Sequence, residues 1–437
     1  SRQYGRVQLC LAGHSSYSPH RCHSPGSWIS GRSQFPVNND TYNPWRSRII
    51  LLTLVHVVGT IGYTSVMTMA PVIRVDLTLN ATQIGSFMSA FYFALAVGAI
   101  PAGALADRLG VTSSLAIASF VMALGSGLFS VVSNYLPALL ATFLMGLGYS
   151  LVNPATAKGV LIWFNPNQRA TAMGVKQMGV PIGALLASGF GALVVFIHWR
   201  WLLLVGTGIT IIIGVIWWQL MQCKTTDTGS IKKTFDGLKA VMKNKNLLFF
   251  NGASATFNAG QQTFTTYLTL FLRDVAGASQ PLAALCVGLS QITGATGRVL
   301  WAYSSDRFAN GRRKGIVVGI MTTASILMFI FATTDTSTPI ILIVFLSLAL
   351  GGTVLAYAAL LHTICAEAVP KDMAGAAIGS NLLATSLGGT FGPILFGLII
   401  DNFGGYPLAW VVTGLMTLGG AMFVAFLFSE VRLKTKL

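Results

Sequence analysis

Residues 103–110 read Gly-Ala-Leu-Ala-Asp-Arg-Leu-Gly and connect two apolar stretches of the chain. A partial copy, Ala-Tyr-Ser-Ser-Asp-Arg, follows another apolar stretch at residues 302–307. A second pair of segments agrees with the first, because a polar turn and a glycine open the apolar stretches that begin near residues 170 and 374. The two pairs of repeated segments predict two related halves in the same orientation, as a parallel internal duplication produces.

Twelve apolar blocks surround these repeats, and each is about 20 residues or longer, which is enough to cross a bilayer core. Charged residues make up only 9% of the chain, whereas ordinary soluble domains carry about 25%. Such a chain cannot cover itself with a solvated surface. We therefore predict an all-α membrane protein with twelve transmembrane helices in two pseudo-symmetric six-helix bundles. The blocks lie near residues 49–73, 83–103, 112–132, 135–157, 170–197, 199–221, 247–272, 281–303, 315–333, 338–365, 374–400 and 405–429.

The blocks and the polar segments between them predict five parts. These are a disordered N-terminal extension (1–45), a first six-helix bundle (46–222), a cytoplasmic linker (223–246), a second six-helix bundle (247–430) and a cytoplasmic tail (431–437). The extension contains no apolar core of signal-peptide length, so we interpret it as a disordered segment or an upstream translation artefact. The lysine-rich linker has apolar residues at helical spacing, which favours an amphipathic helix on the membrane surface, and a flexible linker is an equal alternative.

The basic residues are concentrated in one set of loops between the blocks. That set and the tail hold Arg108, Lys158, Arg169, the lysines of residues 224–245, Arg307, Arg312, Arg313, Lys314, Lys371, Arg432, Lys434 and Lys436. The opposite loops hold only Arg74, Arg200 and Arg273. Because short basic loops resist translocation, we expect both termini to be cytoplasmic and the protein to lie in the plasma (inner) membrane. The same pattern leaves no basic face for nucleic acid, despite a net charge of +16.

The cysteines and histidines predict neither a disulfide framework nor a metal site. Two of the five cysteines lie in the extension, two inside apolar blocks and one in a loop. The cysteines and histidines of the extension match no zinc-ligand spacing. No nucleophile and base pair and no phosphate-binding loop is recognisable in the sequence, so we expect no enzymatic activity and no cofactor.

With these features the chain resembles the major facilitator superfamily over about residues 46–430. The spacing Gly-x-x-x-Asp-Arg-x-Gly of residues 103–110 carries most of the resemblance. In that family this loop and its copy control the closing of the inner face. The resemblance therefore implies a gating motif made of Gly103, Asp107, Arg108, Gly110, Asp306 and Arg307. Val111 and Thr112 lie where the family usually has basic residues, which implies that this loop holds the inner face closed less strongly.

A narrower resemblance bears on the substrate. The segments around Asn153 and Lys176 are similar to those of prokaryotic permeases of organic anions. The dipeptide Gly297-Arg298 is similar to the eighth helix of oxalate/formate antiporters and monocarboxylate carriers, where an arginine is thought to meet a carboxylate. The resemblance implies a small organic anion as substrate.

Four basic or titratable side chains fall inside apolar blocks: His56, Lys176, Arg298 and His362. At a rise of about 1.5 Å per helical residue, all four lie about 10–12 Å inside the inner boundary, near the midplane of a core about 30 Å thick. No carboxylate falls clearly at that depth. Charges in the bilayer are costly and point to function, and two cations without a carboxylate suit an anion.

The candidate substrate-binding residues have alternative roles. They are Arg298, Lys176, Gln177, His56, His362, Tyr63 and Asn153. Arg298 either holds an anion or pairs with helix carbonyls, and the stem of Lys176 is long enough to reach the interface, which would leave Gln177 facing the substrate. The two histidines either relay a proton or form neutral hydrogen bonds between helices. Tyrosine and amide side chains either bind substrate or join helices.

We expect a secondary transporter that moves a small organic anion by proton symport or anion exchange through alternating access, and that works as a monomer. A drug or metabolite efflux carrier of the same fold is the nearest alternative, although the export of cationic drugs would ordinarily require a buried carboxylate. A membrane sensor that does not transport is a weaker alternative, because no signalling domain is recognisable in the sequence.

Overall fold

The computed structural model describes Trp45 and residues 47–165, 168–220, 243–308, 313–369 and 373–429. All regular elements within these ranges are helical. The predicted N-terminal extension, the proposed amphipathic helix of the linker and the tail fall outside the described residues almost entirely.

The first half contains six predicted spans, several of them divided by a break. Its helices are α1 (Arg48–Thr68), α2 (Ala70–Asp76), α3 (Ala81–Val131), α4 (Tyr135–Ser150), α5 (Val152–Trp163), α6 (Arg169–Gln177), α7 (Gly179–Leu193) and α8 (Trp199–Gln219). A capping box formed by Asn80 and Gln83 starts α3. Two spans follow each other within α3 and change direction at Gly110, whose φ of 78° is in the region that favours glycine.

The second half repeats this pattern. Its helices are α10 (Lys245–Asp274), α11 (Gln280–Phe308), α12 (Arg313–Ala332), α13 (Ile340–Val354), α14 (Ala358–Glu367), α15 (Ala374–Ile399), the π-helical turn η3 (Ile400–Gly404) and α16 (Gly405–Leu427). The break between α13 and α14 corresponds to the break between α4 and α5 in the first half. Breaks within a span leave backbone carbonyls without helical partners, which side chains can then contact.

Seven helical stretches among the described residues are long and apolar enough, by length and composition alone, to cross a membrane. The other predicted spans are too short or too polar as helices to be among these seven. Two of them are split, into α6 and α7 and into α13 and α14, and α10 and α11 carry polar side chains such as Gln262 and Arg298. Polar residues inside a span are expensive in lipid, so these spans are where function is expected.

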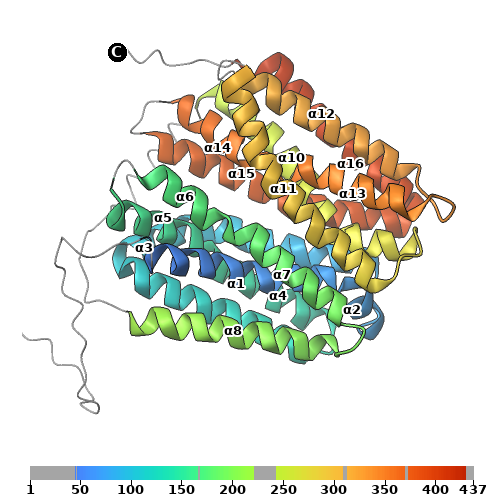
Figure 1. The fold of residues 1–437 in the computed structure, drawn as a ribbon, viewed down its shortest axis with the longest axis horizontal. Helices are drawn as coiled ribbons and strands as arrows, with labels where there is room; N and C mark the ends of the chain where they lie inside the picture. Colours follow the sequence, from blue (N-terminus) through green and yellow to red (C-terminus); the bar gives the residue numbers. More distant parts are fainter. Residues whose placement is uncertain are drawn as a thin grey trace, which may run out of the picture. The chain divides into compact units, whose positions relative to one another are not determined.

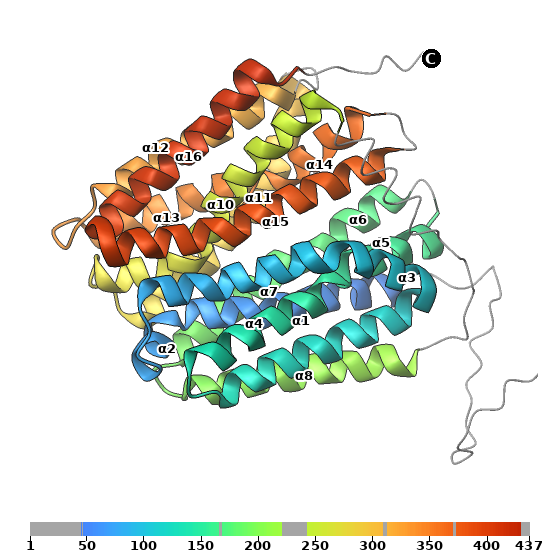
Figure 2. The ribbon, with the colours of Figure 1, turned by 180° about the vertical axis from the view of Figure 1, so that it is seen from behind.

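Figure 1 shows the helices of the first half, coloured blue to green, in one bundle and those of the second half, coloured yellow to red, in another. The halves meet most extensively where α3 lies against α15 and where α7 lies against α11. Figure 2, seen from behind, shows α3 and α15 running side by side. The predicted fold of two six-helix bundles is confirmed.

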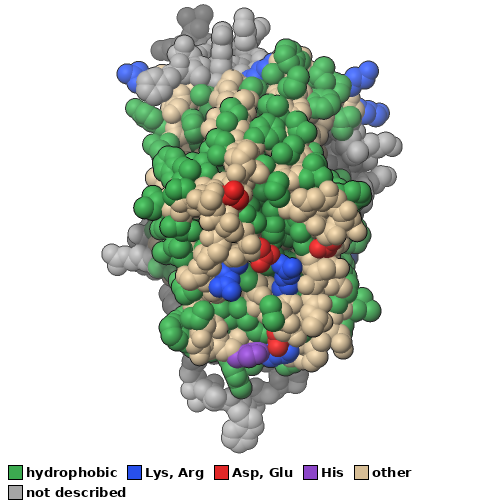
Figure 3. Space-filling model, turned by 90° about the vertical axis from the view of Figure 1, so that its right-hand side faces the viewer, with side chains coloured by type: hydrophobic (Ala, Val, Ile, Leu, Met, Phe, Trp, Pro, Cys, Tyr) green, Lys and Arg blue, Asp and Glu red, His purple; other side chains and the backbone are tan. Residues whose placement is uncertain are grey.

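Hydrogen bonds between the halves gather at one end of the helices, which we name the α2 end. There Arg74 Nη1 lies 2.6 Å from Asp274 Oδ2. The Asp401 carboxylate accepts hydrogen bonds from the backbone N–H of Ala81 at 3.1 Å and of Thr82 at 2.8 Å. Backbone carbonyls of the first half accept further hydrogen bonds from the side chains of Gln280, Thr269 and Tyr267. Figure 3 views this end, where acidic and basic side chains lie near one another among apolar ones.

The opposite end, which holds α6 and which we name the α6 end, differs. Its ion pairs lie within one half each: Lys158 Nζ is 3.0 Å from Asp107 Oδ1, and Arg313 Nη2 is 2.9 Å from Glu367 Oε1. Among the described residues, no hydrogen bond between the halves is found at this end. The structure therefore represents a state that is closed at the α2 end.

Replacement of Asp401 with Asn is expected to loosen this closure. The carboxylate also accepts the Thr82 hydroxyl at 2.6 Å, and negative charge at a helix N-terminus contributes about 0.3–2 kcal/mol. A cysteine introduced at Ser188, which packs against Gly288 across the halves, should react with a water-soluble thiol reagent about 2- to 30-fold faster in Asp401→Asn, in a background without native cysteines.

Asp335→Asn is the matched control for this measurement. The carboxylate of Asp335 is fully exposed, and the hydrogen bonds that it accepts from Ser337 and Thr338 in its own loop lower its pKa. Its removal should leave the reactivity of the cysteine unchanged. Equal rates in the Asp401 variant and the control would show that Asp401 does not hold the α2 end closed.

Candidate functional site

Arg298 is half-buried on α11 and is anchored to the break between α13 and α14. Its Nε donates a hydrogen bond of 2.9 Å to the carbonyl of Leu355, the residue that ends α13. One turn further along α11, Trp301 Nε1 donates to the carbonyl of Gly352 at 2.9 Å. The structure thus contains the helix-carbonyl contact that the sequence offered as an alternative role for Arg298. It uses only Nε, and the described part of the chain provides no hydrogen-bond partner for the two Nη groups.

Lys176 is buried near the end of α6, with 4% of its surface exposed. Its Nζ donates a hydrogen bond of 2.9 Å to the hydroxyl oxygen of Thr156 on α5. The same oxygen lies 3.2 Å from Nε2 of His56, a fully buried residue of α1. On the other side of the imidazole ring, Nδ1 lies 3.5 Å from the hydroxyl of Tyr149 on α4. Four helical segments of the first half therefore contribute one continuous polar chain.

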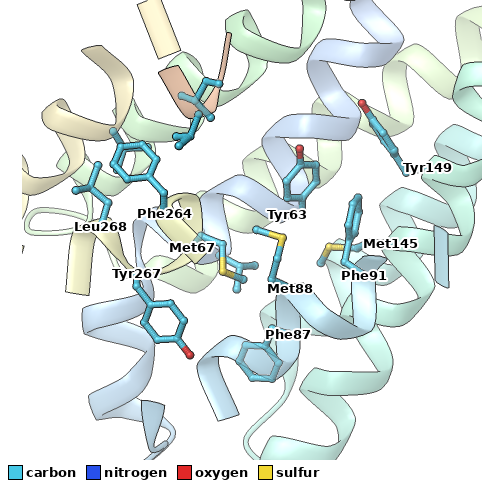
Figure 4. Close-up of a cluster of buried hydrophobic side chains, with 14 of the residues drawn as sticks. Tyr63, Met67, Phe87, Met88, Phe91, Met145, Tyr149, Phe264, Tyr267 and Leu268 are labelled. Carbon is cyan, nitrogen blue, oxygen red and sulfur yellow. The ribbon is translucent and has the colours of Figure 1, made fainter. Parts of the chain in front are cut away.

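Tyrosines of both halves lie within electrostatic range of Arg298. They are Tyr357 of the second half and Tyr63 and Tyr149 of the first. The rings of Tyr63 and Tyr149 have centroids 6.1 Å apart in an edge-to-face arrangement. Figure 4 shows their hydroxyls pointing to the same side, away from the hydroxyl of Tyr267. Arg298 therefore faces the first half across the boundary between the bundles.

His362 lies within electrostatic range of both Arg298 and Lys176. It is half-buried on α14. The three residues come from α14, α11 and α6, and thus from both halves. Their convergence on one cavity stays a prediction of the sequence.

Gln177 and Asn153 are less directly connected to this region. Gln177 is half-buried at the last position of α6. Asn153 is half-buried in the first turn of α5, where its backbone carbonyl accepts a bond of 3.1 Å from the Thr156 hydroxyl. No side-chain hydrogen bond joins either residue to the cations within the described ranges.

An amide network fixes the second-half side of the site. Asn258 Oδ1 accepts the Tyr357 hydroxyl at 3.0 Å and Gln262 Nε2 at 3.2 Å, and Asn258 Nδ2 donates to the Thr385 carbonyl at 2.7 Å. The ring of Phe257 packs on Tyr357 with centroids 4.2 Å apart. These contacts hold the phenol of Tyr357 beside the guanidinium.

Sequence reasoning did not single out Tyr92 or Thr156. Tyr92 on α3 lies near Tyr63, Tyr149, Tyr357 and Gln262. It packs so closely on α15 that a side chain at position 389 would collide with its ring. Thr156 joins Lys176 to His56. A tyrosine or threonine inside an apolar block carries no distinguishing signal, because such residues more often only join helices.

The predicted gating motif lies at the α6 end, and no hydrogen bond or ion pair between its described side chains and the other half is found. Lys158 Nζ reaches the Asp107 carboxylate and also the carbonyls of Ala106 and Asp107 at 3.4 and 3.3 Å. A Cβ at Gly103 would have no neighbour within 4 Å. Arg108 and Arg307 are exposed, and the side chain of Asp306 lies outside the described residues.

The electrostatics of the site are cationic. The ion pairs of the described residues lie at the two ends of the helices, and none of them involves Lys176 or Arg298. The described ranges contain no group of three side chains suited to a metal ion. A small pocket between α10, α15 and α16 is lined by uncharged residues and is separate from the cations. Negative charge on a ligand would be favourable beside Arg298 and Lys176.

Comparisons with known proteins agree with this geometry. The sequence is 26% identical to a hexuronate transporter of Bacillus subtilis over 387 residues, covering 84% of this chain and 90% of the relative. It is 22% identical to a probable L-galactonate transporter of Escherichia coli over 407 residues, covering 87% and 89%.

Solved structures support the fold. The chain superposes on a mutant of the nucleoside transporter NupG with a TM-score of 0.73 and 18% identity, covering 87% of this chain and 100% of that one. A bacterial homologue of the human lysosomal transporter Spinster, in an inward-facing and unoccupied conformation, gives a TM-score of 0.71 at 17% identity, covering 88% and 95%. The sequence matches the Major Facilitator Superfamily over residues 52–389. The protein belongs to the Major Facilitator Superfamily and is a membrane transporter of that fold.

Proposed function

We propose that the protein carries a small organic acid across the plasma membrane by alternating access, with the carboxylate held between Arg298 and Lys176. The observation that supports this most is the pair of basic side chains from opposite halves, both acting on His362 and neither paired with a carboxylate. An arginine whose Nη groups are unoccupied can hold a carboxylate through two parallel hydrogen bonds.

The remaining polar groups favour a hydroxylated acid. The relatives named for hexuronate and L-galactonate act on acids that carry several hydroxyl groups. In this chain, the phenols of Tyr63 and Tyr149 lie within electrostatic range of Arg298. Tyr92 lies near these two phenols and near the amide of Gln262. Tyrosine and amide groups can donate to and accept from hydroxyl groups, so a sugar acid would satisfy them while the cations hold its carboxylate.

We also propose that the α6 end faces the cytoplasm, because the basic residues of the short loops lie there. In this orientation the structure is closed towards the outside. Transport would then alternate between this state and one in which the α2 end separates and the Gly103 to Gly110 loop closes the cytoplasmic face.

The test is uptake into proteoliposomes of a panel of labelled hexuronates, aldonates and short monocarboxylates, with a neutral hexose and a cationic drug for comparison. Saturable uptake of at least one acid, absent from protein-free vesicles, is expected. Transport of the drug and of none of the acids by folded protein would contradict the proposal and favour the efflux carrier.

A further inference from the structure

Tyr357 lies in the break between α13 and α14, shortly after Leu355, whose carbonyl accepts the hydrogen bond from Arg298 Nε. Its side chain is buried, with 2% of the residue exposed. It lies within electrostatic range of Arg298, and the ring of Phe257 packs on it. The break thus supplies both the carbonyl that anchors Arg298 and a fixed phenol near the same guanidinium group.

The hydrogen bonds of Asn258 determine where the hydroxyl proton of Tyr357 points. Asn258 Nδ2 lies 2.7 Å from the backbone carbonyl of Thr385. Because a carbonyl only accepts, the amide nitrogen has to face Thr385. The amide oxygen Oδ1 is therefore the atom that lies 3.0 Å from the hydroxyl of Tyr357. An amide oxygen also only accepts, so the single hydroxyl proton of Tyr357 is donated to Asn258.

This arrangement leaves the phenol oxygen of Tyr357 as an acceptor. The two lone pairs of Asn258 Oδ1 are taken by the Tyr357 hydroxyl and by Gln262 Nε2, which lies 3.2 Å away. Within the described ranges, no group is found that donates to the phenol oxygen of Tyr357. A buried acceptor that lacks a donor is unfavourable, so this oxygen favours a ligand that brings one.

We infer that Tyr357 selects acids that carry a hydroxyl group close to the carboxylate, and that it does so by accepting a hydrogen bond from that hydroxyl. This inference rests on the proposed function and narrows its substrate class. While the Nη groups of Arg298 hold the carboxylate, the neighbouring hydroxyl donates to the phenol oxygen. The phenol cannot donate in return, because Asn258 holds its proton. Tyr357 is then a specificity-determining residue, and Asn258 is the positioning residue that sets the direction of the bond.

The direction of the bond decides which analogues are rejected. A keto group or a fluorine at the same carbon can only accept, so it would meet the lone pairs of the Tyr357 oxygen without a proton between them. A site built to hydrogen-bond a substrate hydroxyl strongly rejects an analogue that lacks it, because its buried polar group is left unpaired.

A deoxyfluoro analogue of the transported acid tests this selection, because fluorine is close to a hydroxyl in size but does not donate. Dissociation constants are measured by displacement of the labelled acid from solubilised protein. In the natural protein, fluorine in place of the hydroxyl nearest the carboxylate should weaken binding about tenfold or more. In Tyr357→Phe, binding of the acid itself should weaken about tenfold, whereas binding of the fluoro analogue should stay within about threefold.

Tyr135→Phe is the matched control, because it also removes a hydrogen-bonded phenol hydroxyl. Tyr135 begins α4, and its hydroxyl lies 2.9 Å from the hydroxyl of Ser86 within the first half. This variant should keep the full preference of the natural protein for the acid over its fluoro analogue.

Asn258→Ala tests the positioning role with a readout that loss of structure alone would not produce. Without the amide oxygen, the hydroxyl proton of Tyr357 can turn towards the ligand, so the phenol becomes able to donate. Binding of the keto analogue relative to the acid should therefore improve about tenfold over the natural protein. An unchanged preference in folded Asn258→Ala would overturn the inference.

Two further outcomes would overturn it as well. They are equal binding of the acid and its fluoro analogue by the natural protein, which requires no variant, and an equal loss of affinity for both ligands in Tyr357→Phe. Absence of saturable binding and uptake of every acid by the folded natural protein would instead overturn the proposed function.

Discussion

Arg298→Gln should lower kcat/KM for uptake of the acid by about 30-fold or more, while the protein remains folded. Removal of one partner of a buried, charge-assisted hydrogen bond costs about 2–5 kcal/mol, and each 1.4 kcal/mol corresponds to about a factor of ten. The glutamine cannot offer the two parallel N–H groups of the unoccupied Nη atoms. The variant loses the contact with the substrate carboxylate both when the substrate binds and when the protein changes conformation. We therefore expect the effect in KM and in the maximal rate.

Two further variants separate this role from a structural one. Arg298→Lys keeps the charge but lacks Nε, which donates to the Leu355 carbonyl, and lacks the planar fork. It should therefore remain at least about tenfold impaired. Arg273→Gln removes an arginine that is exposed at the end of α10 and should transport normally. If Arg298→Gln and Arg273→Gln had the same kcat/KM, Arg298 would only support the break between α13 and α14.

The sequence predicted the fold because the lipid environment restricts what the chain can do. Apolar blocks of span length have few alternatives to membrane helices, and the repeated Asp-Arg loops at residues 107 and 306 indicated the duplication. The depth argument also places His56, Lys176, Arg298 and His362 at one level, and this placement stays a prediction.

Details of the site could not be predicted because they depend on where helices break and which side chains face each other. The sequence does not show that α13 ends at Leu355 and offers its carbonyl to Arg298. It also gives no reason to choose Thr156 among the many threonines as the residue that joins Lys176 to His56. Helical spacing gives the face of a residue only when the helix is continuous, and α5, α6 and α14 are all short.

Gly85→Ala should prevent closure at the α2 end and reduce transport about 5- to 150-fold, the range that corresponds to a shift of about 1–3 kcal/mol between two states. Gly85 lies on α3, and a Cβ there would collide with the hydroxyl of Tyr267 and with the backbone carbonyl of Pro393 on α15. Tyr267 itself donates to the carbonyls of Ala81 and Pro393 at 2.7 and 3.0 Å, so it is fixed between the halves. Overpacking of such a contact costs about 1–3 kcal/mol, and it acts only in the state that brings α3 and α15 together.

The position of the effect can be verified with the cysteine at Ser188, which should react faster in Gly85→Ala, as it should in Asp401→Asn. Gly208→Ala on α8 is the matched control, because a Cβ at position 208 would meet nothing within 4 Å. Gly103→Ala provides a contrast, since Gly103 is also open in this state and the family resemblance assigns it to the opposite closure. If it impairs transport, it should do so without raising the reactivity of the cysteine. Normal transport by Gly85→Ala would mean that the close approach of α3 and α15 is not required in the transport cycle.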